Sequence, residues 1–423
     1  MRTLLLLFVS FIFSLQAQAQ IEESILLNEG ELDIPVYRYP ASGSKAPLVL
    51  WLPSSHGTSP KQNITAQGLA ELGVETWIVD LHLAYFVDPG RASIEEFKAK
   101  DIAQLLRYAS GENQRKIYVM SSDAGAISAL RGIALYQQQT ASSGETLLLA
   151  GAILFEPKLN FPANAPGEAP QYLPIAHNST IPIYYIQPGN STRQWRRNEI
   201  VEILQSGGSQ VFLRAMPDVV SGFQQRPNED LNDVDIAQRA KLPAEIKRAV
   251  QILAVQTTPK PPSPVSLATA PESAKPVFGL SKLPGKSALP LAMIDSQGQE
   301  QSINYLDHTL SLVSFWASWC QPCIVELPAL KRLHDDYAKQ GLSIITINVG
   351  ESKQAMQSAI ERFAMQGYTN LSDPEGETMK AWNVLGFPTN FLVSTDGTLS
   401  HGSFGAVEWD ATEVRTLIDQ QLK

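Results

Sequence analysis

The chain of 423 residues contains two cysteines, Cys320 and Cys323, and they lie three positions apart. The run 310–316 before them is apolar, β-branched and aromatic, which is typical of a buried strand. Apolar residues at helical spacing follow over 324–340, and Gly341 ends that pattern. The pair is therefore predicted at a strand-to-helix turn, with Cys320 at the N-terminus of the helix. Since the chain has no other cysteine, each sulfur can exchange bonds within the chain only with the other.

A helix N-terminus favours a thiolate over a thiol, because free amide N–H groups and a partial charge of about +0.5 stabilise the anion. Cysteines so placed commonly have a pKa of about 3.5 to 7.5, against about 8.5 for the free side chain. Cys320 is therefore the predicted nucleophile of thiol–disulfide exchange. Cys323, one turn further along the helix, is the predicted resolving thiol that attacks the mixed disulfide.

Three other roles of a cysteine pair fit the sequence less well. A zinc site needs two more ligands, usually at Cys-x-x-Cys or His-x-x-x-His spacing, and the six histidines are far apart, so no metal is predicted. An inert bridge over so short a loop would constrain the unfolded chain little. A peroxidase of the peroxiredoxin type would have its cysteine in a Pro-x-x-x-Thr-x-x-Cys setting, which is missing. Redox exchange without a cofactor is the leading hypothesis.

Further motifs accompany the cysteines over 285–423. Gly386-Phe387-Pro388-Thr389 follows at the distance where thioredoxin-like folds have a cis-proline, Asp396-Gly397 reads as a hairpin turn, and Ser296-Gln297-Gly298 as another. This segment resembles the thioredoxin superfamily, most closely its TlpA/ResA-like branch. The resemblance implies a thioredoxin-like fold, reduction of protein disulfides, and Pro388 in the catalytic site facing the cysteines. It also implies that the substrate is bound by Trp319, Pro322, Phe387 and Thr389.

The resemblance also gives a role to Glu326. Thioredoxin has a buried aspartate six residues before its first cysteine, where this chain has Ser314. TlpA/ResA-like proteins instead have a glutamate three residues after the second cysteine, which corresponds to Glu326. At that helical spacing Glu326 is expected beside Cys323, where it would move the proton of that thiol. The alternative is an exposed first-turn glutamate that the helix dipole favours.

Residues 1–19 have the pattern of a signal peptide: a positive start, an apolar run, and small residues before the expected cleavage site. The run is shorter than the about 20 residues that span a bilayer, so we expect a soluble periplasmic protein without stable membrane insertion after cleavage. The net charge of −9 argues against nucleic-acid binding. A reductant in an oxidising compartment must itself be re-reduced, so a membrane electron donor is an expected partner besides the protein disulfide substrate.

A proline-rich stretch divides the chain. Six prolines lie within 256–276, and a segment of this composition behaves as an extended spacer. We therefore expect a domain at 20–255, a linker at 256–284 and a thioredoxin-like domain at 285–423. The expected fold class is α/β, with a mainly parallel sheet in the first domain. The first domain shows predicted strands at 47–52, 74–81, 116–120, 147–155, 181–186 and 210–213, alternating with helical stretches that include 68–72, 93–108 and 126–137.

This order resembles the α/β-hydrolase superfamily, but its catalytic positions are altered. Asp123 stands at the nucleophile position of an elbow-like turn, and His56 lies where an oxyanion loop is often found. The histidine base expected late in the domain is missing, and Ser221 stands near its usual place. We interpret the domain as non-catalytic, with a binding or recruitment role. A periplasmic binding protein with an accessory redox domain, or an exported hydrolase acting through His56 and Asp123, are the alternatives.

Overall fold

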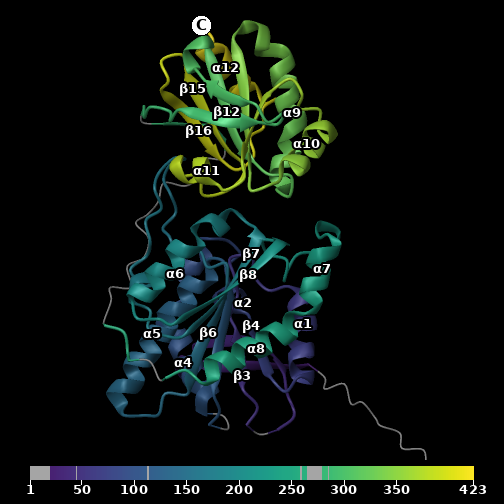
Figure 1. The fold of residues 1–423 in the computed structure, drawn as a ribbon. Coiled ribbons are helices and arrows are strands. Elements are labelled where there is room, and N and C mark those ends of the chain that lie inside the picture. The colour runs from purple at the N-terminus through teal and green to yellow at the C-terminus, as the bar shows by residue number, and fades with distance from the viewer. Residues whose placement is uncertain (1–19, 44, 112–113, 258–259, 264–278, 284) are drawn as a thin grey trace, which may run out of the picture.

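The computed structural model describes residues 20–43, 45–111, 114–257, 260–263, 279–283 and 285–423. The signal peptide predicted at 1–19 lies outside the described residues, as does much of the predicted linker. Two eight-stranded sheets are present in the described parts of the chain, one formed by strands before the proline-rich stretch 256–276 and one by strands after it. We refer to the two sides as the N-terminal region and the C-terminal region (Figure 1).

The first sheet has the strand order β1-β2-β4-β3-β5-β6-β7-β8. From β4 through β3 to β8 all neighbours are parallel, and the β1–β2 hairpin adds antiparallel strands at one edge. The mainly parallel sheet predicted from the sequence is thus confirmed. Its strands are β1 (Ile21–Leu27), β2 (Leu32–Tyr39), β3 (Leu48–Trp51), β4 (Glu75–Val79), β5 (Ile117–Ser122), β6 (Leu149–Phe155), β7 (Ile183–Asn190) and β8 (Val211–Val220).

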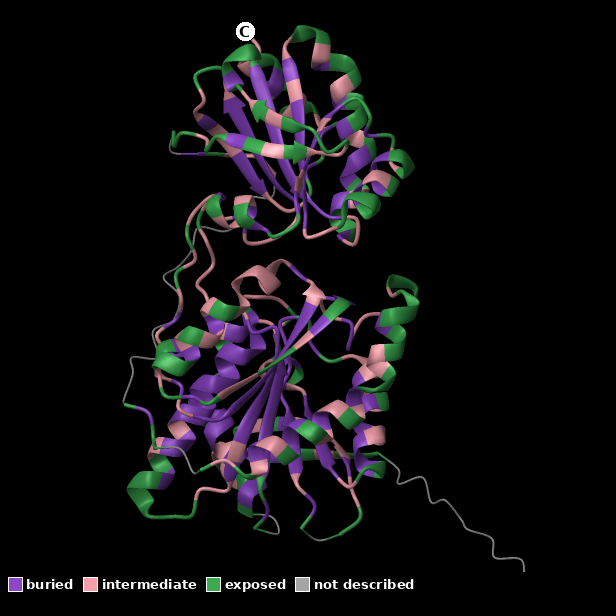
Figure 2. Cartoon of the chain, viewed as in Figure 1, coloured by how far each residue is buried: buried purple, intermediate pink, exposed green. Residues whose placement is uncertain are grey.

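Helices cover both faces of this sheet. Residues of α4, α5 and α6 form one apolar layer, and residues of α1 and α8 form the other, as Figure 1 shows. The central strands are buried along their whole length in Figure 2, which explains why they read as continuous apolar runs. The helices are α1 (Pro60–Glu71), α2 (Leu81–Tyr85), α3 (Ser93–Glu96), α4 (Ala99–Gly111), α5 (Gly125–Ser143), α6 (Arg197–Ser206), α7 (Asp233–Ala240) and α8 (Leu242–Ala254), with 3-10 turns η1 (Asn28–Gly30), η2 (Ala176–Asn178), η3 (Thr192–Arg196) and η4 (Asn228–Asp230).

One predicted helix is wrong as a single element. The stretch 93–108 is divided into α3 and α4, because Phe97 between them has an extended backbone with ψ of 108°. This turn buries the Phe97 ring, which packs edge-on against His82 at 5.0 Å and against Tyr85 at 5.4 Å between centroids. Burial of one aromatic ring therefore outweighs helical continuity at this point.

The second sheet has the order β11-β10-β14-β13-β12-β15-β16-β9. Strands β12, β13 and β14 are parallel, and β15 runs antiparallel to β12. Helices α9, α10 and α12 pack on one face, and α11 packs on the other. The region has a thioredoxin-like fold. Its elements are β9 (Ser281–Lys282), β10 (Leu291–Asp295), β11 (Glu300–Ile303), η5 (Tyr305–Asp307), β12 (Leu310–Trp316), α9 (Gln321–Tyr337), η6 (Ala338–Gln340), β13 (Leu342–Val349), α10 (Lys353–Arg362), β14 (Thr369–Asp373), α11 (Glu377–Ala381), β15 (Thr389–Ser394), β16 (Leu399–Phe404) and α12 (Thr412–Gln421).

Candidate redox site and the N-terminal polar cluster

The cysteine pair lies at the turn from β12 to α9. Every residue of β12 is buried, and the strand ends at Trp316, four residues before the first cysteine. Cys320 is the N-cap of α9, and its Sγ accepts a hydrogen bond from the backbone N–H of Cys323 at 3.2 Å. The two sulfurs form a disulfide, and the cysteines are 5% and 1% exposed. The strand-to-helix placement predicted from the sequence is confirmed.

The segment Gly386–Thr389 lies beside the cysteine turn. The Phe387–Pro388 peptide bond is cis, and Thr389 at the start of β15 pairs with Phe315 near the end of β12. Thr389 is fully buried, and its hydroxyl donates to the carbonyl of Gly386 at 2.8 Å. The sheet register therefore brings this loop to the strand end from which the cysteine turn departs.

Two of the side chains predicted to bind substrate touch each other. The ring centroids of Trp319 and Phe387 are 5.7 Å apart, so the residue before Cys320 packs on the residue before the cis-proline. Pro322 is in the first turn of α9, where its missing N–H leaves no hydrogen bond unmade. Trp319 and Pro322 thus flank the disulfide at the start of α9, and Phe387 comes from the cis-proline loop that packs against Trp319.

Glu326 is buried in α9 and is 4% exposed, so its alternative interpretation as an exposed first-turn glutamate is wrong. Its carboxylate accepts hydrogen bonds from the Val407 N–H at 2.9 Å and from the Asn390 amide at 3.5 Å. Burial raises the pKa of Glu326 to about 7, although these two donors oppose the shift. The carboxyl group can therefore gain and lose a proton near neutral pH.

A polar cluster lies at the carboxyl ends of the parallel strands in the N-terminal region. Asp123 occupies the sharp turn between β5 and α5 with a left-handed φ of 51°. A Cβ on Gly125 would lie 2.2 Å from the carbonyl oxygen of Pro53, so this turn packs against the loop after β3. Close packing of that kind requires glycine at 125. The turn has the strand–turn–helix form that the sequence predicted.

Asp123 is held by an ion pair and a hydroxyl group. One carboxylate oxygen accepts from Arg193 Nη2 at 2.5 Å, and the other accepts from Ser55 Oγ at 2.5 Å. Burial alone would raise the pKa of Asp123, but Arg193, Lys158 and the Ser55 hydroxyl outweigh it, and the pKa is lowered. The carboxylate is therefore ionised, and a guanidinium occupies one of its two oxygens.

Glu156 follows β6 and completes the cluster. It accepts hydrogen bonds from Ser221 Oγ at 2.6 Å, the Gly222 N–H at 3.0 Å and Ser191 Oγ at 2.8 Å. Arg193 Nη1 approaches Glu156 at 3.4 Å, so this one guanidinium bridges both carboxylates. Sequence reasoning missed Glu156 and Arg193. For Glu156 the available signal was a carboxylate directly after the predicted strand 147–155, at the end of a parallel strand where ligands and polar groups gather.

The two predicted hydrolase residues are not joined by a described contact. His56 is exposed, and its backbone N–H donates a hydrogen bond to Ser54 Oγ at 3.1 Å. His82 is buried and hydrogen bonds Ser93 at 3.0 Å, which is a structural arrangement. The partners of Asp123 are thus Ser55 and Arg193 in place of a histidine base.

Residues of η3 in the N-terminal region contact the C-terminal region near the cis-proline. The Trp195 ring lies 6.3 Å from the Phe387 ring, and Thr192 Oγ1 donates to the Leu385 carbonyl at 3.3 Å. A Cβ on Gly350 would lie 2.3 Å from Trp195, and a Cβ on Gly376 would lie 2.4 Å from it. The Trp195 indole therefore packs against the backbone of Gly350 and Gly376, directly beside the cis-proline loop of the candidate redox site.

Comparison with known proteins places the similarity in the C-terminal region. A profile of the AhpC/TSA family matches residues 284–401. The chain is 32% identical over 113 residues to the thiol-disulfide oxidoreductase ResA of Geobacillus kaustophilus, covering 27% of this chain and 64% of that protein. It is 30% identical over 98 residues to the sporulation thiol-disulfide oxidoreductase A of Bacillus subtilis, covering 22% and 59%. The chain thus spans somewhat less than two thirds of these relatives.

A solved thiol-disulfide oxidoreductase from Bacteroides fragilis is 27% identical, with a TM-score of 0.28, and covers 31% of this chain and 99% of that one. Within the described ranges, no helix is long and apolar enough to cross a membrane. The same residues contain no group of three or more His, Cys, Asp or Glu side chains that could hold a metal ion.

Proposed function

We propose that the protein is an exported thiol:disulfide oxidoreductase that reduces protein disulfides through Cys320 and Cys323. The observation that carries this proposal is a disulfide at the N-terminus of α9, beside a cis-proline loop and one turn from a buried glutamate. Similarity to thiol-disulfide oxidoreductases over the same residues supports it.

The proposed reaction moves two electrons from the dithiol to the substrate. The Cys320 thiolate attacks one sulfur of the substrate disulfide, that S–S bond breaks, and one substrate thiolate leaves. Cys323 then loses its proton to Glu326 and attacks the Cys320 sulfur. The second substrate thiolate leaves, and the Cys320–Cys323 disulfide remains. Pro388, Trp319, Pro322, Phe387 and Thr389 are proposed to hold the substrate chain at the site.

The proposed cellular location and domain organisation rest on the sequence. We propose residues 1–19 as a signal peptide, 256–284 as a linker, and the periplasm as the location, with a membrane electron donor that re-reduces the disulfide. The N-terminal region at 20–255 is proposed as an α/β-hydrolase-like domain without hydrolase activity. The ion pair of Asp123 with Arg193 supports the absence of hydrolase activity, because a catalytic nucleophile must be accessible to the substrate and the reaction needs an adjacent base.

A binding or recruitment role for the N-terminal region is a second proposal. The contacts of Trp195 and Thr192 beside the cis-proline loop favour it, since they bring the N-terminal strand ends close to the candidate redox site. A molecule held at these strand ends would therefore lie next to the segment that is proposed to bind the disulfide substrate.

Trapping of a mixed disulfide tests the proposed activity. In the full chain with Cys323→Ser, the Cys320 thiolate attacks a protein disulfide and cannot be released by a neighbouring thiol. We expect a covalent adduct with native insulin, whose disulfides are intact, and this adduct should disappear on adding dithiothreitol. Non-reducing electrophoresis and mass spectrometry measure it. The matched variant Cys320→Ser should give no adduct; an adduct formed equally by both variants would contradict the assigned order of attack.

Replacement of Glu326 tests its proposed part in proton transfer. The active form is the carboxylate, so resolution of the mixed disulfide should speed up as pH rises through about 7 in the parent chain. Glu326→Gln should remove this rise and slow resolution by about 100-fold at pH 8. Stopped-flow tryptophan fluorescence measures the step. A parent profile without an inflexion near pH 7 would contradict this role.

The same substitution has a second readout, in stability. Because the pKa of Glu326 is raised in the folded chain, ionisation costs stability as pH rises from the ordinary value of about 4.5 through 7. Glu326→Gln should therefore leave stability unchanged near pH 4 and raise it by about 3 kcal/mol above pH 7. Urea unfolding of the oxidised chain at both pH values measures the difference.

A further inference from the structure

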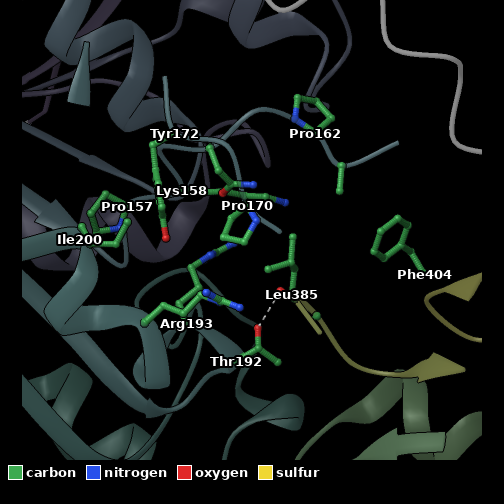
Figure 3. Close-up of a pocket in the computed structure, with 14 residues that line it drawn as sticks. Pro157, Lys158, Pro162, Pro170, Tyr172, Thr192, Arg193, Ile200, Leu385 and Phe404 are labelled. Carbon is green, nitrogen blue, oxygen red and sulfur yellow. Dashed lines mark hydrogen bonds between the residues drawn. The ribbon is translucent and has the colours of Figure 1, made fainter. Parts of the chain in front are cut away.

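A cavity of about 290 Å³ lies between the N-terminal and C-terminal regions (Figure 3). Its N-terminal wall includes Lys158 after β6 and Thr192 and Arg193 after β7, at the strand ends where parallel sheets bind ligands. The C-terminal region contributes Leu385 and Phe404. This volume is close to the lower end of known small-molecule sites, which begin at about 300 Å³. It suits one small molecule better than a folded partner.

The charged residues that line the cavity are all cations: Lys158, Arg193 and Arg196. Arg193 is already paired with Asp123 and Glu156, and Arg196 with Glu199 at 3.1 Å. The Lys158 ammonium, in contrast, makes no hydrogen bond or ion pair with any described residue. Burial first and Arg193 second lower the pKa of Lys158 to about 8, with Asp123 opposing. Its charge therefore lacks a direct counter-ion in the cavity.

The rest of the lining is mostly apolar. Prolines and Ile200 come from the N-terminal region, and the side chains of Leu385 and Phe404 close the opposite side, as Figure 3 shows. Tyr172 adds an aromatic ring with one hydroxyl group. A ligand that matches these walls has an apolar body and an anionic head placed at Lys158. An inorganic anion would leave the apolar walls uncovered, and a neutral hydrocarbon would leave Lys158 unpaired.

We propose that this cavity binds a small carboxylate with an apolar body, whose carboxylate pairs with Lys158 and whose body contacts Ile200, Leu385 and Phe404. Since the lining comes from both regions, the bound molecule also holds them together beside the cis-proline loop. This inference rests on the binding role proposed for the N-terminal region and uses no step of the redox reaction. It assigns that role a ligand class and a place.

Isothermal titration of the full-length mature chain with octanoate tests the proposal. Octan-1-ol has the same body without the charge, and acetate has the same head without the body. We expect saturable binding of octanoate, with octanol and acetate each at least tenfold weaker. Equal affinities for octanoate and octanol, or no saturable binding of octanoate, would overturn the proposal. Disulfide reduction is not measured in this experiment, so failure of the redox proposal would leave its result unaffected.

Variants locate the site. Lys158→Met keeps roughly the length of the side chain without its charge. It should lower the affinity for octanoate at least tenfold and leave the affinity for octanol unchanged. Lys98→Met removes an exposed lysine elsewhere and should change neither affinity. Phe404→Ala, in the C-terminal region, should weaken the binding of octanoate and of octanol. If Lys158→Met unfolds the chain, Phe404→Ala still tests whether the ligand binds in this cavity. Unchanged octanoate binding in a folded Lys158→Met or in Phe404→Ala would place the ligand elsewhere.

Discussion

Cys320→Ser is expected to lower the rate of insulin disulfide reduction by about 1,000-fold or more, to the level of the uncatalysed reaction with dithiothreitol. A serine hydroxyl at the N-cap can still accept the N–H of residue 323, so the helix start should survive. It cannot form the mixed disulfide, and therefore the first step is lost. Turbidity of precipitating insulin chains, followed at a fixed dithiothreitol concentration, measures the rate.

Cys323→Ser is the informative companion of this experiment. It keeps the nucleophile, so a single attack still occurs, but release of the substrate then depends on the external thiol. We expect a reduced steady rate in the presence of dithiothreitol, and the trapped adduct described above in its absence. Equal insulin reduction by the parent and Cys320→Ser would remove the proposed function. If the rate of insulin reduction fell equally in Cys320→Ser and Cys323→Ser and neither variant formed an adduct, the disulfide would be structural.

The redox site could be predicted because its parts are local or fall at fixed distances along the chain. The apolar run of β12, the cysteine spacing and the end of the helical pattern at Gly341 are read from neighbouring residues, and the structure matches each of them. The burial of Glu326 could not be derived in the same way. It depends on Asn390 in β15 and on Val407, which come from distant parts of the chain.

The polar cluster shows the limit of sequence reasoning more clearly. Asp123 was located because it stands at a recognisable turn between a strand and a helix. Its bridge to Glu156 through Arg193 could not be predicted, because the bridge depends on β5, β6 and β7 being neighbours in the sheet. The contact of Trp195 with Phe387 joins segments almost two hundred positions apart, and no periodic pattern in either segment indicates it.

Arg193→Met is expected to destabilise the N-terminal region by about 3 kcal/mol at pH 7. The substitution leaves the carboxylates of Asp123 and Glu156 close together without the cation that bridges them, and Glu156 is only 3% exposed. Removal of one partner of a buried ion pair costs about 3 to 5 kcal/mol. The low end applies here because the Arg193 side chain is 26% exposed and solvent partly screens the pair.

The pH dependence separates this electrostatic loss from a general packing defect. The pKa of Asp123 is lowered in the folded chain, so its contribution to stability is present above the ordinary value of about 3.9 and is lost as pH falls below it. The difference in unfolding free energy between parent and Arg193→Met should therefore be complete at pH 7 and shrink below about pH 4. Urea unfolding at pH 7 and at pH 3, followed by tryptophan fluorescence, measures this difference.

Arg107→Met provides the matched control, because Arg107 pairs with Glu145 on the surface, where both side chains are well exposed. Exposed pairs of this kind contribute about 0 to 1 kcal/mol, so this variant should unfold almost as the parent does. If Arg193→Met lost no more stability than Arg107→Met, the bridge would not hold the strand ends together. A loss in Arg193→Met that stayed the same down to pH 3 would point to packing of its aliphatic stem. The expected result would assign Asp123, Glu156 and Arg193 a structural role, in which one guanidinium holds two carboxylates together at the carboxyl ends of the strands.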